Sequence, residues 1–245
     1  MPRPFPEALL SAWEQGRAEP SPIGRSLALL GATASDPASV PLADLSIGQR
    51  DALLLQLHEE VFGDFFWALA PCEGCQERVE FSFRGSELRS SEPVQCSDKQ
   101  RVSWERYEVE FRMPTSRDLL MVSERKDTAE QRAQLLERIV LSAEQGGEAI
   151  AAEDLPEEVV SAMEETMQSA DARAEVNLRL RCQSCGHEWS ALFDVGSFLW
   201  KKVDAWALRL LQEVHALARA YGWSERDIIC MTPWRRHAYL EMLGT

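Results

Sequence analysis

The sequence predicts an α+β fold in which a small antiparallel sheet is packed by several helices, including a long helix near the C-terminus. Three observations predict it. Two Cys-x-x-Cys pairs, Cys72–Cys75 and Cys182–Cys185, are each followed by the alternating apolar and polar residues of a half-buried strand. Several segments have apolar residues three and four positions apart, which is typical of amphipathic helices. The longest of these segments ends at Tyr221.

The two cysteine pairs have the spacing of zinc knuckles. In a Cys-x-x-Cys turn two thiolates bind one ion, and two such turns complete a tetrahedral zinc shell with no open position. The sequence therefore predicts one structural zinc site with the ligands Cys72, Cys75, Cys182 and Cys185, and a sheet that is zinc-ribbon-like. Unliganded thiols and a thioredoxin-like redox pair are the alternatives, and the redox pair would need a single Cys-x-x-Cys in a βαβ setting.

The separation between the pairs is unusual, because 106 residues lie between Cys75 and Cys182, whereas a compact zinc ribbon has about 15 to 20. The flanks of the two pairs nevertheless match. Strand-like alternation runs over residues 78–83 after the first pair and over 188–193 after the second. This match predicts a duplicated knuckle and strand, closed by one metal ion and interrupted by a long insertion.

Composition and charge narrow the possible functions. The chain is 45% hydrophobic and 27% charged, as expected of a folded globular protein. Its 40 acidic and 26 basic residues give a net charge of −14, and an acidic surface repels nucleic-acid phosphates. No apolar run reaches the roughly 18 residues of a transmembrane helix, and residues 1–6 lack the apolar core of a secretory signal. We therefore expect a cytoplasmic protein with reduced cysteines that binds another protein, and neither nucleic acid nor a membrane.

The first 41 residues are expected to form an N-terminal arm. A short helix is predicted over 6–16, and the proline-bounded run of small polar residues over 31–41 has loop composition. The arm has too few apolar residues for a core of its own, so we expect it to lie across the main domain or to bind a partner. Residues 42–245 are expected to form one zinc-clasped α+β domain with a helical insertion at about 128–171.

Helix and strand patterns follow each other after the arm. A helix is expected from a cap at Ser46 to Phe62, because Gln49 stands in the capping-box position. Residues 65–70 are all apolar and predict a buried strand that leads to Cys72.

A further strand is predicted over 107–111, followed by a helix capped by Thr115 or Ser116. The insertion is expected to contain two amphipathic helices, the second of which opens at Pro156. Their apolar positions are Leu135, Ile139 and Val140 in the first, and Val159, Met163 and Met167 in the second. We expect the methionines to be core residues.

A strand over 176–180 leads into the second cysteine pair, and the long helix begins soon after it. The apolar stripe of this helix consists of Leu199, Val203, Trp206, Leu210, Val214, Leu217 and Tyr221. Gly222 is placed to end the helix, and two short helices are expected after caps at Ser224 and Thr232.

Other candidate residues are expected to have structural roles. His187 lies beside the second pair, but four thiolates already fill the shell, so we interpret it as a polar knuckle residue. His58 lacks the second histidine of a metalloprotease helix, and His215 lies beside the apolar stripe, where a hydrogen-bonded structural histidine is expected. Cys96 and Cys230 have no partners at ligand spacing and are expected to be plain thiols.

The sequence contains no G-x-S-x-G motif, no glycine-rich phosphate loop and no zinc-deaminase signature. A closed zinc shell also leaves no position for a catalytic water. We therefore expect no enzymatic activity and no small-molecule substrate.

Several motifs, spread over most of the chain from about Leu42 onwards, are similar to those of a known family. They are Leu45–Leu55, Phe62–Gly63 with the first knuckle, Pro114–Leu119, Cys182–Trp189, Phe198–Trp200, Leu211–Ala218, Tyr221–Glu225 and Tyr239–Glu241. These motifs resemble the T-even-type baseplate hub assembly chaperone family, which is encoded with contractile phage tails and contractile injection systems. The N-terminal arm and the insertion lie outside them.

The resemblance implies a non-enzymatic assembly factor or structural component of the baseplate hub of a contractile phage tail or contractile injection system. The implied partners are baseplate hub, tube or spike proteins, and the protein is either incorporated in the particle or leaves it. The zinc rests on the four cysteines and not on the family. We expect the C-terminal helices to contact a partner through the tryptophans Trp200, Trp206, Trp223 and Trp234. A cytoplasmic zinc-ribbon adaptor or regulator that binds another protein is the alternative.

Overall fold

The computed structural model of the chain describes residues 6–31, 41–88, 99–123, 127–171 and 176–244. Contacts divide the chain into two units, Asp36–Val195, and Met1–Ser35 with Gly196–Thr245. This grouping differs from the predicted arm over 1–41 and domain over 42–245, because the N-terminal helices belong to the same unit as the C-terminal helices. Whether residues 42–245 fold as one domain stays a prediction. The predicted combination of helices with small antiparallel sheets is confirmed.

The larger unit, Asp36–Val195, contains two antiparallel hairpins of matching design. The first pairs β1 with β2 and the second pairs β7 with β8, and each is a separate two-stranded sheet. Their bounds are β1 Phe65–Pro71, β2 Arg78–Arg84, β7 Asn177–Arg181 and β8 Glu188–Leu192. In both hairpins the innermost pair joins the residue before the first cysteine to the third residue after the second cysteine. The predicted strands beside both cysteine pairs are therefore confirmed.

The inward face of the first hairpin is aromatic. Phe66 of β1 is fully buried and stacks on His58 of α3 (Ile47–Phe62), with 3.8 Å between ring centroids. Phe83 of β2 stacks on Phe66 at 4.9 Å, and Phe193 meets Phe83 edge-on at 5.0 Å. His58 is thus a packed ring within this cluster, as expected for a histidine without metal chemistry.

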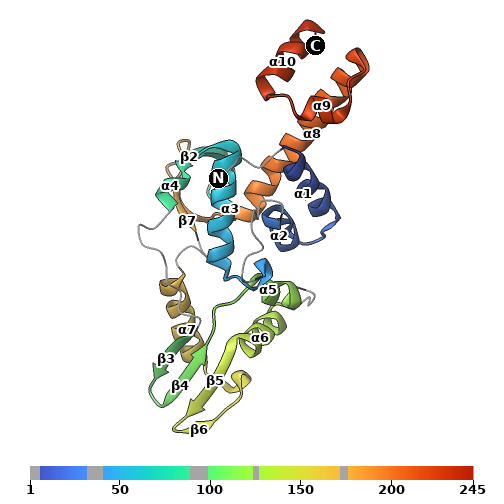
Figure 1. Cartoon of the computed structure of the whole chain (residues 1–245). Coiled ribbons are helices and arrows are strands. Elements are labelled where there is room, and N and C mark those ends of the chain that lie inside the picture. The colour runs from blue at the N-terminus through green and yellow to red at the C-terminus, as the bar shows by residue number, and fades with distance from the viewer. Residues whose placement is uncertain (1–5, 32–40, 89–98, 124–126, 172–175, 245) are drawn as a thin grey trace. The chain divides into compact units, whose positions relative to one another are not determined.

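A four-stranded antiparallel sheet also belongs to this unit, with the strand order β3-β4-β5-β6. The strands are β3 Gln100–Trp104, β4 Tyr107–Phe111, β5 Val140–Gln145 and β6 Glu148–Ala149. Only β4 corresponds to a predicted strand. Helix α7 (Glu157–Ala170) packs against the sheet, as Figure 1 shows. The buried core between them consists of Val102, Val109, Phe111, Ala143, Val159 and Met163. The expected core position of Met163 is therefore confirmed.

The predicted helical insertion at 128–171 is only partly helical. Its two helices are α6 (Thr128–Ile139) and α7, but residues 140–149 between them form β5 and β6. Val140 begins a strand instead of extending the apolar stripe of α6, because β5 pairs with β4 across a long sequence separation. The short elements of the unit are η1 Leu42–Asp44, α4 Gly85–Leu88, α5 Ser116–Val122 and η2 Ala152–Asp154.

Two helix starts lie next to each other in this unit. Ser46 caps α3 and Thr115 caps α5, each in a capping box, and the two cap residues form an isolated antiparallel bridge. Ser46 is thus confirmed as a cap, and Thr115 is the second cap in place of Ser116. The buried Asp171 accepts hydrogen bonds from Ser46 Oγ at 2.8 Å and from the Gly48 N–H at 2.9 Å. Its carboxylate therefore lies at the N-terminus of α3, where the helix dipole favours a negative charge.

Gly48→Ala is expected to destabilise the protein by about 1–3 kcal/mol. A Cβ at Gly48 would lie 1.7 Å from Asp171 Oδ1, so the buried carboxylate would have to move away from its donors. Urea unfolding of both forms measures the difference in unfolding free energy. Gly31→Ala is the matched control, because nothing lies within 4 Å of a Cβ at that position. An equal loss of stability in both variants would contradict the steric explanation.

The smaller unit, Met1–Ser35 with Gly196–Thr245, is helical in its described residues. Its helices are α1 Pro6–Ala18, α2 Pro22–Gly31, α8 Val195–Tyr221, α9 Glu225–Ile229 and α10 Pro233–Met242. Trp13 Nε1 of α1 donates a hydrogen bond to Asp204 Oδ1 of α8 at 2.8 Å. Gly16 lies so close to the Trp200 ring that a Cβ would be 2.4 Å from it. The described N-terminal helices therefore pack on the long helix.

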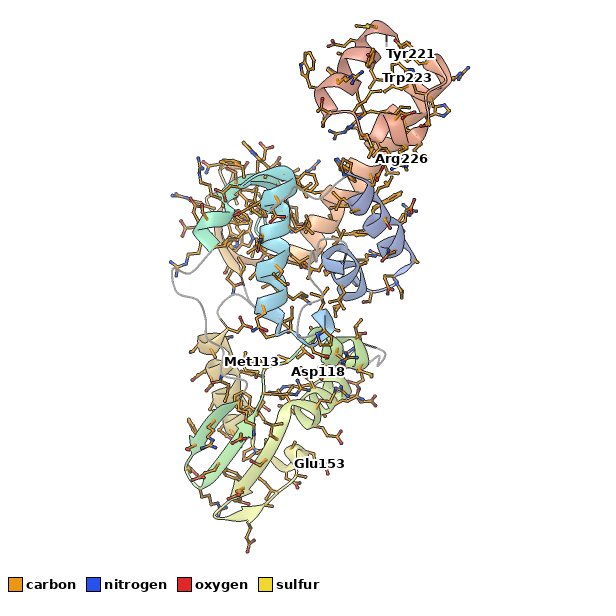
Figure 2. The ribbon with its side chains drawn as sticks, in the orientation of Figure 1. Met113, Asp118, Glu153, Tyr221, Trp223 and Arg226 are labelled. Carbon is orange, nitrogen blue, oxygen red and sulfur yellow. The ribbon has the colours of Figure 1, made fainter. Side chains whose placement is uncertain are left out.

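Aromatic rings and one buried arginine hold the C-terminal helices together. Tyr221 stacks on Trp223 at 4.5 Å, both of which Figure 2 labels, and Tyr239 meets Trp223 edge-on at 4.8 Å. The buried Arg236 of α10 donates from Nε to Glu213 Oε2 of α8 at 2.7 Å. This ion pair fixes α10 against α8.

The helix ends of this unit follow the signals in the sequence. Gly222, in the left-handed conformation with φ of 68°, follows the last residue of α8. Ser224 caps α9 and Thr232 caps α10, as predicted. Of the helices described in the whole chain, none is long and apolar enough to cross a membrane.

Candidate metal centre

The two matched hairpins bring the four predicted cysteines together. One pair lies in the turn between β1 and β2, the other lies between β7 and β8, and all four Sγ atoms lie within 4.8 Å of one another. Cys72 Sγ is 3.6 Å from Cys185 Sγ, and Cys75 Sγ is 3.7 Å from Cys182 Sγ. Each cysteine of one pair thus contacts a cysteine of the opposite pair.

The sulfur positions fit a tetrahedral metal site. With metal–sulfur bonds of about 2.3 Å, sulfurs at the corners of a tetrahedron lie about 3.8 Å apart, close to the two measured separations. Cys72 and Cys182 are buried, Cys75 and Cys185 are exposed, and none of the four forms a disulfide bond. The four cysteines are therefore positioned to bind one metal ion.

The two turns have the same pattern of internal backbone hydrogen bonds, in agreement with a duplicated knuckle. In each turn the N–H of the first cysteine donates to a carbonyl oxygen five residues later, at 2.8 Å and 2.9 Å. The carbonyl of that cysteine accepts from the N–H four residues later, at 2.9 Å and 3.0 Å. The donor is Gln76 in the first turn and Gly186 in the second, and both are left-handed, with φ of 62° and 75°. Glycine adopts this conformation readily, so Gln76 is a position where the turn imposes an unfavourable backbone.

Backbone donors and neighbouring thiols make the four cysteines unequal. The N–H of Cys185 is the main cause that lowers the pKa of Cys182 to about 6. The N–H of Glu77 lowers the pKa of Cys75, but hydrogen bonds with neighbouring thiols and burial outweigh it and raise that pKa to about 12. A metal ion that binds all four sulfurs must displace the protons that remain on the thiols.

Apolar side chains cover the two buried cysteines. Val79 and Trp189 pack against the two buried cysteines. His187 stacks near Trp189, with 6.0 Å between ring centroids, and does not belong to the group of four ligand side chains. A Cβ at Gly74 would lie 3.2 Å from His187, so this glycine lets the two turns approach closely. Sequence reasoning missed Gly74, although a glycine inside a Cys-x-x-Cys turn is the signal that could have found it.

The remaining candidates, where the structure describes them, do not belong to the group of four ligand side chains. Cys230 is exposed and Cys96 lies outside the described residues. His215 is exposed on α8. Of the four tryptophans expected at an interface, Trp234 is 80% exposed, whereas the others are partly buried.

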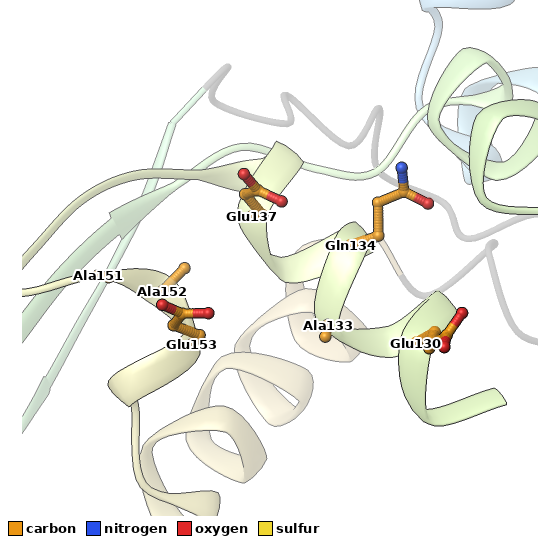
Figure 3. A pocket seen from close by; sticks show the side chains of 7 residues that line it. All are labelled: Glu130, Ala133, Gln134, Glu137, Ala151, Ala152 and Glu153. Carbon is orange, nitrogen blue, oxygen red and sulfur yellow. The ribbon is translucent and has the colours of Figure 1, made fainter. Parts of the chain in front are cut away.

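Two cavities of the larger unit are lined without cysteine or histidine. One of about 480 Å³ lies where α6 approaches residues 151–153, and Figure 3 shows its three glutamates, Glu130, Glu137 and Glu153. The other, of about 360 Å³, includes Met113 and Asp171 in its lining. Among the described residues, the cysteine cluster is therefore the group of side chains that stands out as a site.

Comparison with known proteins places the chain in a family. A family model described as T4 bacteriophage base plate protein matches residues 29–200, which is more than half of the chain. The matched segment includes both hairpins and all four cysteines of the cluster. No curated protein and no solved structure matches the chain. The chain therefore belongs to the T4 bacteriophage base plate protein family.

Proposed function

We propose that the protein is a structural component of the baseplate hub of a contractile phage tail or contractile injection system, and that a zinc ion holds its two hairpins together. The observation that carries the proposal is the family match over residues 29–200, which spans both cysteine pairs. A baseplate component needs a rigid surface for its neighbours. An ion bound between the hairpins would supply that rigidity.

Zinc is the proposed ion because of the donor set. Four thiolates in a tetrahedral arrangement suit zinc or iron–sulfur chemistry, and structural zinc sites with four cysteines use paired turns of this spacing. The ligands are Cys72, Cys75, Cys182 and Cys185. When bound, zinc links the two hairpins. Four thiolates leave no position for a water molecule in a tetrahedral shell, which supports a non-enzymatic protein without a small-molecule substrate.

The proposed partners are baseplate hub, tube or spike proteins. Membership of a base plate protein family implies contacts with other baseplate proteins. Trp234 and Met242 of α10 are 80% and 73% exposed, and exposed tryptophans are frequent anchors at protein interfaces. Assembly takes place in the cytoplasm, where cysteines stay reduced and available to the metal. An assembly chaperone that leaves before the particle is complete is a second version of this role, implied by the resemblance of the motifs.

Mass spectrometry of purified particles and of assembly intermediates from a producing strain tests the proposal. The protein is expected in mature particles at a fixed ratio to the other baseplate proteins, and deletion of its gene is expected to abolish complete baseplates. Detection in intermediates alone would select the chaperone role. Complete baseplates in the deletion strain would overturn both roles and favour an adaptor without a function in the tail.

A further inference from the structure

The outward face of the first hairpin carries an apolar stripe. On β1, Phe65, Trp67 and Leu69 alternate with inward-facing residues and are 41%, 58% and 51% exposed. The all-apolar run over 65–70 predicts a buried strand, and that prediction is wrong for these three residues. Apolar patches of this kind on a folded protein mark interaction sites.

The second hairpin offers an internal comparison. Counted from the first cysteine of each turn, Trp67 and Leu69 correspond to Asn177 and Arg179 on β7. The outward face of β7 and β8 is polar apart from Leu192. The two hairpins therefore have the same turn geometry but different outward faces, one with an apolar stripe and one that is mostly polar. Metal binding does not account for the apolar stripe, because the second hairpin positions its two cysteines in the same way and has no such stripe.

β1 also lacks the charges that normally protect an exposed strand. None of its seven residues is charged, whereas β7 carries Arg179 and Arg181. Natural proteins place charges on exposed strands to prevent association with other chains. The β1 side of this face therefore has no charged side chain that would oppose association with another chain.

Charged side chains of β2 lie beside the apolar stripe on the same face. In the register of the first hairpin, Phe65 lies opposite Arg84 and Leu69 lies opposite Glu80. Directly paired residues of an antiparallel sheet point to the same face, so Arg84 lies beside the Phe65 end of the stripe and Glu80 beside the Leu69 end, with Arg78 opposite Pro71 beyond Glu80. Arg84 Nη1 also lies 3.8 Å from Asp64 Oδ2 of its own chain. The Arg84 guanidinium lies 5.7 Å from the centre of the Phe65 ring, and its side chain is 61% exposed. Glu80 is exposed as well.

We propose that this face binds a second copy of the same chain, face to face, about a two-fold axis that runs across the strands at Trp67. The strands of the two copies are then antiparallel. Trp67 of one copy then packs on Trp67 of the other, and Phe65 packs on Leu69 of the other copy. Arg84 of each copy pairs with Glu80 of the other, so this ion pair occurs twice. A parallel arrangement would bring like charges to the same level, which the charge pattern disfavours.

The size of the face sets the strength of the dimer. Two strands of seven residues cover about 23 Å by 10 Å, or about 230 Å² per copy. The total of about 460 Å² is well below the roughly 1,200 Å² of a stable interface. The dimer is therefore expected to be weak and to form in a concentration-dependent way.

Sedimentation equilibrium of the full chain at rising concentration and about 0.15 M salt, where long-range repulsion between acidic copies is screened, tests the proposal. The weight-average mass is expected to rise from 27.7 kDa toward twice that value. Trp67→Lys is expected to abolish the rise. Leu192→Lys places the same charge on the outward face of the second hairpin and is expected to leave the rise unchanged.

A charge exchange identifies the geometry. Arg84→Glu is expected to weaken the dimer at least several-fold, and adding Glu80→Arg to the same chain is expected to restore it. Arg179→Glu makes the same change on the second hairpin and should have no effect. Circular dichroism confirms that each variant is folded. Wild-type protein that stays at the monomer mass at all concentrations, as it would if another baseplate protein covered the stripe, overturns the proposal, and so does a double variant that fails to recover.

Discussion

Cys72→Ser is expected to abolish binding of the proposed zinc ion and to unfold at least the hairpin layer formed by β1, β2, β7 and β8. Cys72 is fully buried and its Sγ lies 3.6 Å from Cys185 Sγ, so the substitution removes one of the two buried ligands of the candidate site. A two-stranded hairpin is at best marginally stable in water, and each of these hairpins is a separate two-stranded sheet. Structural zinc contributes apparent free energies of about 10–16 kcal/mol in small domains, so its loss should exceed any single packing defect.

Elemental analysis and thermal melting measure the two effects of this substitution. Wild-type protein is expected to carry one zinc ion per chain, and Cys72→Ser is expected to carry much less and to melt at a lower temperature. Cys230→Ser is the matched control, because Cys230 is an exposed thiol outside the cluster. Wild-type protein without zinc, or a Cys72→Ser variant with unchanged metal content and melting temperature, would contradict the proposed structural zinc.

The cysteine cluster could be predicted from the sequence because most of its geometry is local. A Cys-x-x-Cys spacing and the strand that follows it define a turn, and matching flanks indicated that two such turns belong together despite the 106 residues between them. The structure brings all four Sγ atoms within 4.8 Å. The caps at Ser46 and Thr115 could be predicted for the same reason, since each depends on a side chain three residues away.

The four-stranded sheet could not be predicted in this way, because its strands are defined by distant partners. Val140 fits the helical stripe of the preceding residues as well as it fits a strand. It becomes part of β5 because this segment pairs with β4 and places Ala143 in a core with Val109 and Met163. Strand preference depends on such packing more than on the local sequence, so periodicity alone assigned the segment to a helix.

The exposed stripe on β1 has a related cause. An uninterrupted apolar run contains no polar residues that could mark an outward face, so periodicity predicts burial on both sides. Phe65, Trp67 and Leu69 share one face because side chains alternate along a strand, and only their exposure in the structure shows that the described residues leave this face uncovered.

Asp118→Asn is expected to destabilise the larger unit by about 3 kcal/mol at neutral pH. Asp118, labelled in Figure 2, lies in the first turn of α5 and accepts two hydrogen bonds from Arg112, at 2.6 Å and 2.9 Å. It also accepts from Arg138 Nε at 2.9 Å and from the Thr115 N–H and Oγ1 at 3.0 Å and 2.9 Å. Its side chain is 1% exposed, but both arginine side chains are 30% exposed. Breaking a buried ion pair costs about 3–5 kcal/mol, and the partial hydration of the arginines places the expected value at the low end.

The pH dependence of the unfolding free energy distinguishes the contribution of the Asp118 charge from that of its side-chain shape. Burial alone would raise the pKa of Asp118, but its hydrogen bonds, above all those from Arg112, outweigh burial and hold the pKa far below the ordinary value of 3.8. A lowered folded-state pKa stabilises the fold fully above the unfolded-state pKa of about 3.9, and this contribution is lost as the pH falls toward the folded-state pKa. Urea unfolding should therefore show a larger difference between wild type and Asp118→Asn at pH 7 than at pH 3. Arg117→Ala is the control, because Arg117 pairs with Asp44 at the surface, where an ion pair contributes about 0–1 kcal/mol. A difference that stays constant between the two pH values, or that only equals the control, would show that the ionised carboxylate is not what stabilises this helix start.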